Sequence, residues 1–115
     1  MIKADQDENR RGHPCWSRDG QTQALRVELA DGSFYLFPYS RLAVVHFEPG
    51  NDHETLHVVW DTHKIEIAGK HLREVGLALQ KAGVDWVRAL PDRFSPQADG
   101  EHAWITNITV GELEG

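Results

Sequence analysis

Histidines and carboxylates, which both bind metal ions, gather in one part of this chain. Seven histidines occur in 115 residues, and four of them fall between residues 53 and 71 among acidic side chains. Imidazole and carboxylate groups together form the usual ligand set of zinc and of non-haem iron. Residues four apart on a strand share a face, so His57 and Asp61 would lie together. The pattern indicates a candidate zinc site made of His53, His57, Asp61 and His63.

A simpler interpretation treats these residues as solvent-facing positions of strands and turns, with His71 in the first turn of a helix. The sequence contains no cysteine-rich ligand set, which would have favoured a metal. We therefore predict no cofactor, with zinc as the alternative.

The single cysteine, Cys15, has His13 two residues before it, and a thiol next to a base is a candidate nucleophile. Both residues fall in a segment expected to be mobile, where that geometry would not be held. The chain has no Gly-x-Ser-x-Gly, Walker A or Gly-x-Gly-x-x-Gly motif, which are the usual signs of a hydrolase or of a nucleotide site. No catalytic residue is predicted, and the chain is expected not to be an enzyme.

Aromatic side chains crowd the stretch 34–39, and two further tryptophans lie in otherwise polar flanks. Aromatic residues on both faces of a strand indicate that both faces are covered. We expect an interface with another protein subunit formed by Phe34, Tyr35, Phe37, Tyr39, Trp16 and Trp104. The alternative, a stacking platform for single-stranded nucleic acid, would need interleaved cations, and only Arg41 follows the stretch.

The net charge of −6 is spread unevenly. Residues 1–23 are balanced, residues 24–90 carry seven cations and nine acids, and residues 91–115 carry one cation and five acids. Phosphate binding draws on clustered Lys and Arg, so nucleic acid is not an expected partner. No run approaches the 18–20 apolar residues of a membrane span, and the N-terminus has no apolar core of a secretory signal. We expect a soluble, cytoplasmic protein.

Apolar alternation predicts the secondary structure. Strands are expected near 24–29, 33–39, 41–48, 54–60, 64–68 and 84–88. The Asp31-Gly32 pair favours a type I′ hairpin turn, and Pro38 marks a strand end or an edge. Leu72, Val75, Gly76 and Leu79 form one face of a helix over about 70–82, closed by Gly83 as C-cap.

These elements predict a mainly β (α+β) fold, an antiparallel meander of five to six strands with one amphipathic helix. The meander would form either a strongly bent open sheet or a small barrel, and its outline resembles SH3/Sm-type and pleckstrin-homology-type barrels. We expect a flexible N-terminal arm over 1–23, a single domain over 24–90, and an acidic C-terminal extension over 91–115 with one added strand at 103–110.

The chain has more aromatic side chains than its predicted core can easily bury. This favours a non-catalytic binding or assembly module that forms a homodimer or binds another protein. A roughly 65-residue core cannot easily bury ten aromatic side chains, each of about 150–250 Å². The first alternative is a metal-binding protein or metal-dependent enzyme that uses the 53–71 region. The second is a nucleic-acid-binding small barrel.

Overall fold

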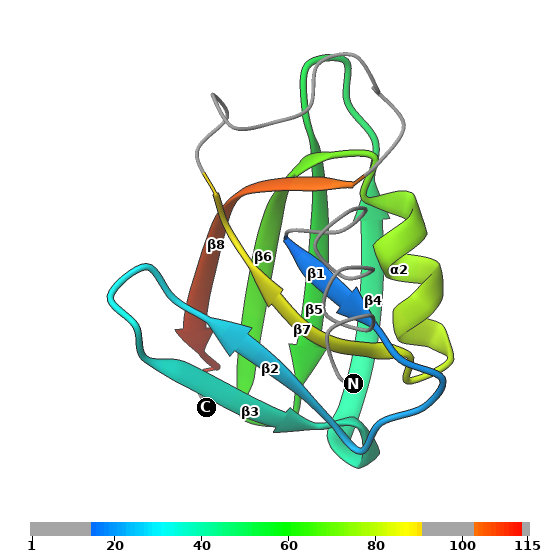
Figure 1. Cartoon of the computed structure of the whole chain (residues 1–115), viewed down its shortest axis with the longest axis vertical. Coiled ribbons are helices and arrows are strands. Elements are labelled where there is room, and N and C mark those ends of the chain that lie inside the picture. The colour runs from blue at the N-terminus through cyan, green and yellow to red at the C-terminus, as the bar shows by residue number, and fades with distance from the viewer. Residues whose placement is uncertain (1–14, 91–102, 114–115) are drawn as a thin grey trace, which may run out of the picture.

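The computed structural model describes residues 15–90 and 103–113. In this part the chain forms eight strands, a 3-10 turn (η1) and one helix (Figure 1). Their bounds are β1 Trp16–Arg18, β2 Ala24–Glu28, β3 Phe34–Pro38, η1 Tyr39–Arg41, β4 Leu42–Glu48, β5 Glu54–Trp60, β6 His63–Lys70, α2 Arg73–Gln80, β7 Val84–Arg88 and β8 Trp104–Glu112.

The strands form two sheets of four, with the order β1-β7-β2-β3 in the front sheet and β4-β5-β6-β8 in the back sheet. Figure 1 shows the front sheet crossing the face of the back sheet, with α2 along the side next to β4. The mainly β fold with one helix is confirmed. The described residues form two open sheets and no closed barrel.

The meander is divided between the two sheets. The pairs β2–β3, β4–β5 and β5–β6 are antiparallel, as expected, but β3 and β4 belong to different sheets. Pro38 ends β3 because it has no N–H for a ladder, and the 3-10 turn Tyr39–Arg41 then redirects the chain. After the helix crossover, β7 lies parallel to β2.

The hairpin between β2 and β3 has a three-residue loop in place of the expected two-residue type I′ turn. The Leu29 N–H donates to the Ser33 carbonyl at 2.9 Å, and the Gly32 N–H donates to the Leu29 carbonyl at 3.0 Å. Gly32 alone in this loop has a positive φ, of 93°. This is the type I turn with a left-handed glycine that serves three-residue hairpins.

Both flanks of the expected domain contribute strands. Residues 1–14 of the expected arm over 1–23 lie outside the described residues. In the rest of this segment Trp16 is fully buried and belongs to β1, which pairs with β7. In the C-terminal extension, β8 pairs with β6 from His63 to Lys70. A register shift at Gly69 bends this pairing, and a Cβ added there would overlap the Trp104 carbonyl.

The helix is shorter than the predicted 70–82 because both of its ends are fixed by neighbours. Lys70 still belongs to β6, and His71 turns the chain with a φ of 57°. The Leu72 N–H donates to Glu54 Oε1 at 2.7 Å, so the cap comes from β5. At the other end Ala82, not Gly83, takes the left-handed conformation, and the Gly83 N–H returns to the Ala78 carbonyl at 2.9 Å, which is a Schellman closure.

One core lies between the two sheets and under the helix. Its largest fully buried side chains are those of Trp16, Trp60, Leu25, Leu56, Ile65, Ile67, Leu72, Leu79 and Ile105. No helix in the described part is long and apolar enough to cross a membrane.

Candidate interaction surface

The four residues of the predicted zinc site do not converge. His57 lies on the outer face of the back sheet, where its Nε2 is 2.9 Å from Glu48 Oε1. Asp61 accepts a hydrogen bond of 2.7 Å from Arg41 Nη1. The His63 ring packs against Phe37, with ring centroids 5.5 Å apart. His53 lies in the loop between β4 and β5. Within residues 15–90 and 103–113 no three His, Cys, Asp or Glu side chains are grouped to hold a metal ion.

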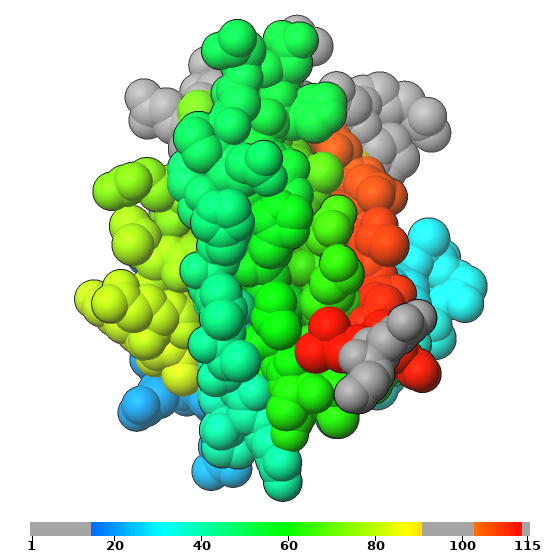
Figure 2. Space-filling view, turned by 180° about the vertical axis from the view of Figure 1, so that it is seen from behind, coloured from blue at the N-terminus to red at the C-terminus, as the bar shows by residue number. Residues whose placement is uncertain are grey.

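The true neighbour of His57 is a histidine that the sequence pattern did not single out. His46 lies directly opposite His57 on β4, and the two rings stack with centroids 5.5 Å apart. On the other side, Glu66 lies opposite, 3.7 Å from His57 Nδ1. Figure 2 views this outer face, from β4 across to β8. Alternation along β4 places Val44, His46 and Glu48 on one face. This pattern identifies His46 as the neighbour of His57 only once the strand register is known.

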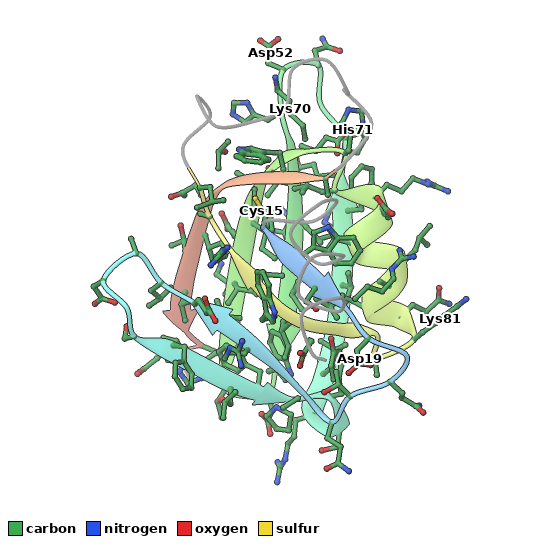
Figure 3. The ribbon with its side chains drawn as sticks, in the orientation of Figure 1. Cys15, Asp19, Asp52, Lys70, His71 and Lys81 are labelled. Carbon is green, nitrogen blue, oxygen red and sulfur yellow. The ribbon has the colours of Figure 1, made fainter. Side chains whose placement is uncertain are left out.

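The loops at one end of the back sheet form a polar hollow of about 240 Å³, lined in part by Asp52, His53, Lys70 and His71. Figure 3 shows Asp52, Lys70 and His71 at this end of the molecule. Side chains of both charge signs line the hollow, so its charge pattern does not select an anion or a cation.

Cys15 is unsuited to nucleophilic chemistry. Its side chain is fully buried (Figure 3), and its Sγ accepts the Ile105 N–H at 3.3 Å. Burial raises the pKa of the thiol, although that N–H and the charge of Arg88 act in the opposite direction. A protonated, enclosed thiol is a poor nucleophile.

An open groove of about 370 Å³ runs between α2 and the edge strand β4. Its walls are largely apolar and include Val45, Phe47 and Gly76. Leu77 is 51% exposed at the rim and also lines a neighbouring hollow of about 420 Å³ at the end of the helix.

The six aromatic residues expected at an interface separate into three environments. Trp16, Trp104 and Phe37 are buried at 0%, 4% and 4% exposure, inside the chain's own core. Tyr39 is half-buried, and its hydroxyl donates to the Val84 carbonyl at 2.7 Å. Phe34 and Tyr35 remain exposed.

Exposed apolar side chains gather on β3, which is an edge strand. Phe34, Tyr35 and Leu36 are 56%, 39% and 62% exposed, which makes three consecutive large apolar residues at the surface. Alternation places Phe34 and Leu36 on the outer face of the front sheet, whereas Tyr35 stacks on Phe37 on the inner face at 5.5 Å. Leu36 was missing from the expected interface, although the same alternation places it beside Phe34.

Polar neighbours limit the apolar strip to this one strand. On β2, Arg26 lies opposite Leu36 and Glu28 lies opposite Phe34. These two charged side chains form an ion pair of 2.9 Å. We call the exposed part of β3, from Phe34 to Pro38, the β3 edge.

The backbone of the β3 edge offers hydrogen-bonding groups to a further strand. The Leu29–Ser33 and Gln23–Tyr39 pairs carry the hydrogen bonds at the two ends of the β2–β3 ladder. Hydrogen-bonded and non-hydrogen-bonded pairs alternate in an antiparallel ladder, so Phe34, Leu36 and Pro38 direct their backbone polar groups away from β2. Pro38 thus sits where its missing N–H breaks no bond to β2.

Comparisons with known proteins add no assignment: no protein-family model matches the chain, and neither a curated protein nor a solved structure matches it.

Proposed function

We propose that this chain is a non-catalytic protein-binding module that accepts an extended segment of another chain along the β3 edge. The observation that carries the proposal is the combination of an edge strand, which has β2 as its one neighbour among the described strands, with three consecutive exposed apolar residues. Addition of a strand to a sheet edge uses backbone hydrogen bonds for affinity and alternating side chains for specificity. The β3 edge supplies both.

Two further observations support binding over catalysis. The one cysteine is enclosed and its pKa is raised. His57 lies on the outer face of the back sheet, with its ring nitrogens 2.9 Å from a Glu48 oxygen and 3.7 Å from a Glu66 oxygen. Natural proteins usually protect an open edge with a charge or a short strand. An edge left apolar is therefore a candidate docking site.

A library of seven-residue peptides displayed on phage tests the proposal, since multivalent display retains weak binders. Peptides enriched on the wild-type protein should have alternating apolar residues. Their binding should fall by about tenfold or more with Leu36→Lys, which replaces an apolar contact by a charge. Val44→Lys is the matched control because Val44 is also exposed, at 53%, but lies on β4. Enriched peptides that bind both variants equally would place the docking site elsewhere.

The proposal includes a cytoplasmic location. The chain has a single cysteine, which is free, and secreted domains of this size commonly rely on disulfides. A tagged full chain recovered with the cytosolic fraction would agree with this location, and recovery from the medium or periplasm would contradict it.

A further inference from the structure

We propose that the segment bound at the β3 edge is the same edge of a second copy of this chain, paired antiparallel about a two-fold axis at Tyr35. In this arrangement Phe34 of each copy faces Leu36 of the other. The inference rests on the proposed function, because it names the partner for the same surface.

The backbone of the β3 edge is complementary to itself in this register. Phe34 and Leu36 each direct one N–H and one C=O outward, so pairing Phe34 with Leu36 of the second copy uses every one of these groups. The competing register, which pairs Leu36 with Leu36, places Phe34 opposite Pro38. Proline has no N–H, so the Phe34 carbonyl of each copy would then lose its partner. Pro38 therefore selects between the two registers.

The charges along the edge also permit self-pairing. Residues 33–40 contain no charged side chain, whereas the other edge strands of the described part contain Arg18 in β1, Glu48 in β4 and Glu112 in β8. Like charges placed directly opposite each other destabilise a ladder. A second copy adds no such contact at β3, although each copy carries a net charge of −6. Because this long-range repulsion is screened by salt, the association should strengthen as salt rises from a low concentration.

The side chains of the two copies then form a matched set. On the outer face, the two phenylalanines and two leucines make a four-residue apolar cluster, in which each aromatic ring faces an aliphatic side chain. Such cross-strand pairs are the favourable unit of sheet association. On the inner face the two Tyr35 rings meet at the axis, each already stacked on its own Phe37.

Disulfide trapping with single introduced cysteines tests the register. Tyr35→Cys places the two thiols at a non-hydrogen-bonded pair on the axis, where the Cα atoms lie about 4.5 Å apart and a disulfide can form. With diamide as oxidant, we expect a covalent dimer for Tyr35→Cys. Leu36→Cys should not crosslink, because the two Leu36 positions are diagonal, and Val44→Cys on β4 is the control for random collision. The native Cys15 is enclosed and should not react.

Each outcome of the trapping decides the question. Crosslinking at Leu36→Cys indicates the competing register or a parallel pair and overturns the proposal. Equal crosslinking at Tyr35→Cys and Val44→Cys also overturns it. Selected peptides that bind the wild type but not Leu36→Lys, without a Tyr35→Cys dimer, would retain the proposed function and reject the second copy as partner.

A charge exchange gives a second test that leaves the inner face unchanged. Leu36→Lys and Phe34→Glu should each be monomeric by sedimentation at concentrations where the wild type and Val44→Lys are dimeric. Mixed one to one, they should form a heterodimer, because one lysine then faces one glutamate while the other pair stays native. A mixture that remains monomeric would contradict the pairing of position 34 with position 36.

Discussion

Replacing Tyr39 by Phe should remove one hydrogen bond that joins the end of β3 to β7. The ring and its packing are kept, whereas the 2.7 Å bond from the hydroxyl to the Val84 carbonyl is lost. A hydrogen bond of this kind contributes about 1 kcal/mol to the free energy of unfolding. We therefore expect Tyr39→Phe to be about 1 kcal/mol less stable than the wild type near pH 7.

The same hydroxyl predicts how this difference changes in alkali. Burial is the main cause that raises the pKa of Tyr39 from its ordinary 10.0 to about 12; the hydrogen bond to Val84 opposes this shift, and the charge of Asp85 adds a smaller part of it. Below pH 10 both the folded and the unfolded chain carry the neutral phenol, so the contribution is complete. Between pH 10 and about 12 the unfolded chain ionises first, and wild-type stability falls. Because Tyr39 is partly exposed, we expect this shift to change the free energy of unfolding by about 1 kcal/mol.

Urea unfolding of both proteins, followed by tryptophan fluorescence at several pH values from 7 to 11.5, checks this reasoning. The stability difference should be steady up to about pH 10 and then shrink towards zero. Other groups also titrate in alkali, but they are common to both proteins and cancel in the difference. Tyr35→Phe is the control, because Tyr35 is 39% exposed and the described residues supply no hydrogen-bond partner for its hydroxyl. A stability difference between the wild type and Tyr39→Phe that stays constant over the whole pH range would refute the raised pKa of Tyr39.

Three further changes test the way the fold is held together. Gly69→Ala should destabilise the chain by more than about 3 kcal/mol, because the new methyl group overlaps the Trp104 carbonyl, whereas Gly111→Ala has open space and should be nearly neutral in thermal unfolding. Glu54→Ala should lower the free energy of unfolding by about 1 kcal/mol, because it removes the cap of α2. Glu54→Gln should restore part of this loss, and urea midpoints that do not change would show that the cap contributes nothing. The Cys15 thiol should react with a chromogenic disulfide reagent only after denaturation, because it is buried with a raised pKa, and fast labelling of the native protein would contradict that placement.

Local patterns were sufficient to predict the described strands except β1, the helix face and the fold class. Alternation from Glu54 to Trp60 and the helical spacing from Leu72 to Leu79 both report burial of one face, and the structure buries those faces. These signals are contained within one element and its immediate neighbours.

Pairing between distant segments could not be read in the same way. The sequence pattern does not reveal that β7 lies beside β2 in parallel or that β8 extends the back sheet next to β6. Without these pairings, the core predicted from the sequence was too small to bury the aromatic residues of the chain. With β1 and β8 added, Trp16 and Trp104 are enclosed, and the exposed apolar surface of the aromatic stretch reduces to Phe34, Tyr35 and Leu36.

The place of β7 in the front sheet has a consequence for synthesis of the protein. β7 contacts β1 and β2 across roughly sixty intervening residues, and without it neither strand is linked to the other. Since a chain emerges from the ribosome N-terminus first, the first two strands must wait for residue 88 before their sheet can form. Until then the β2–β3 hairpin leaves the β2 side open as well as the β3 edge. Contacts of such long sequence separation slow folding, so this interval is when the nascent chain is most prone to aggregate.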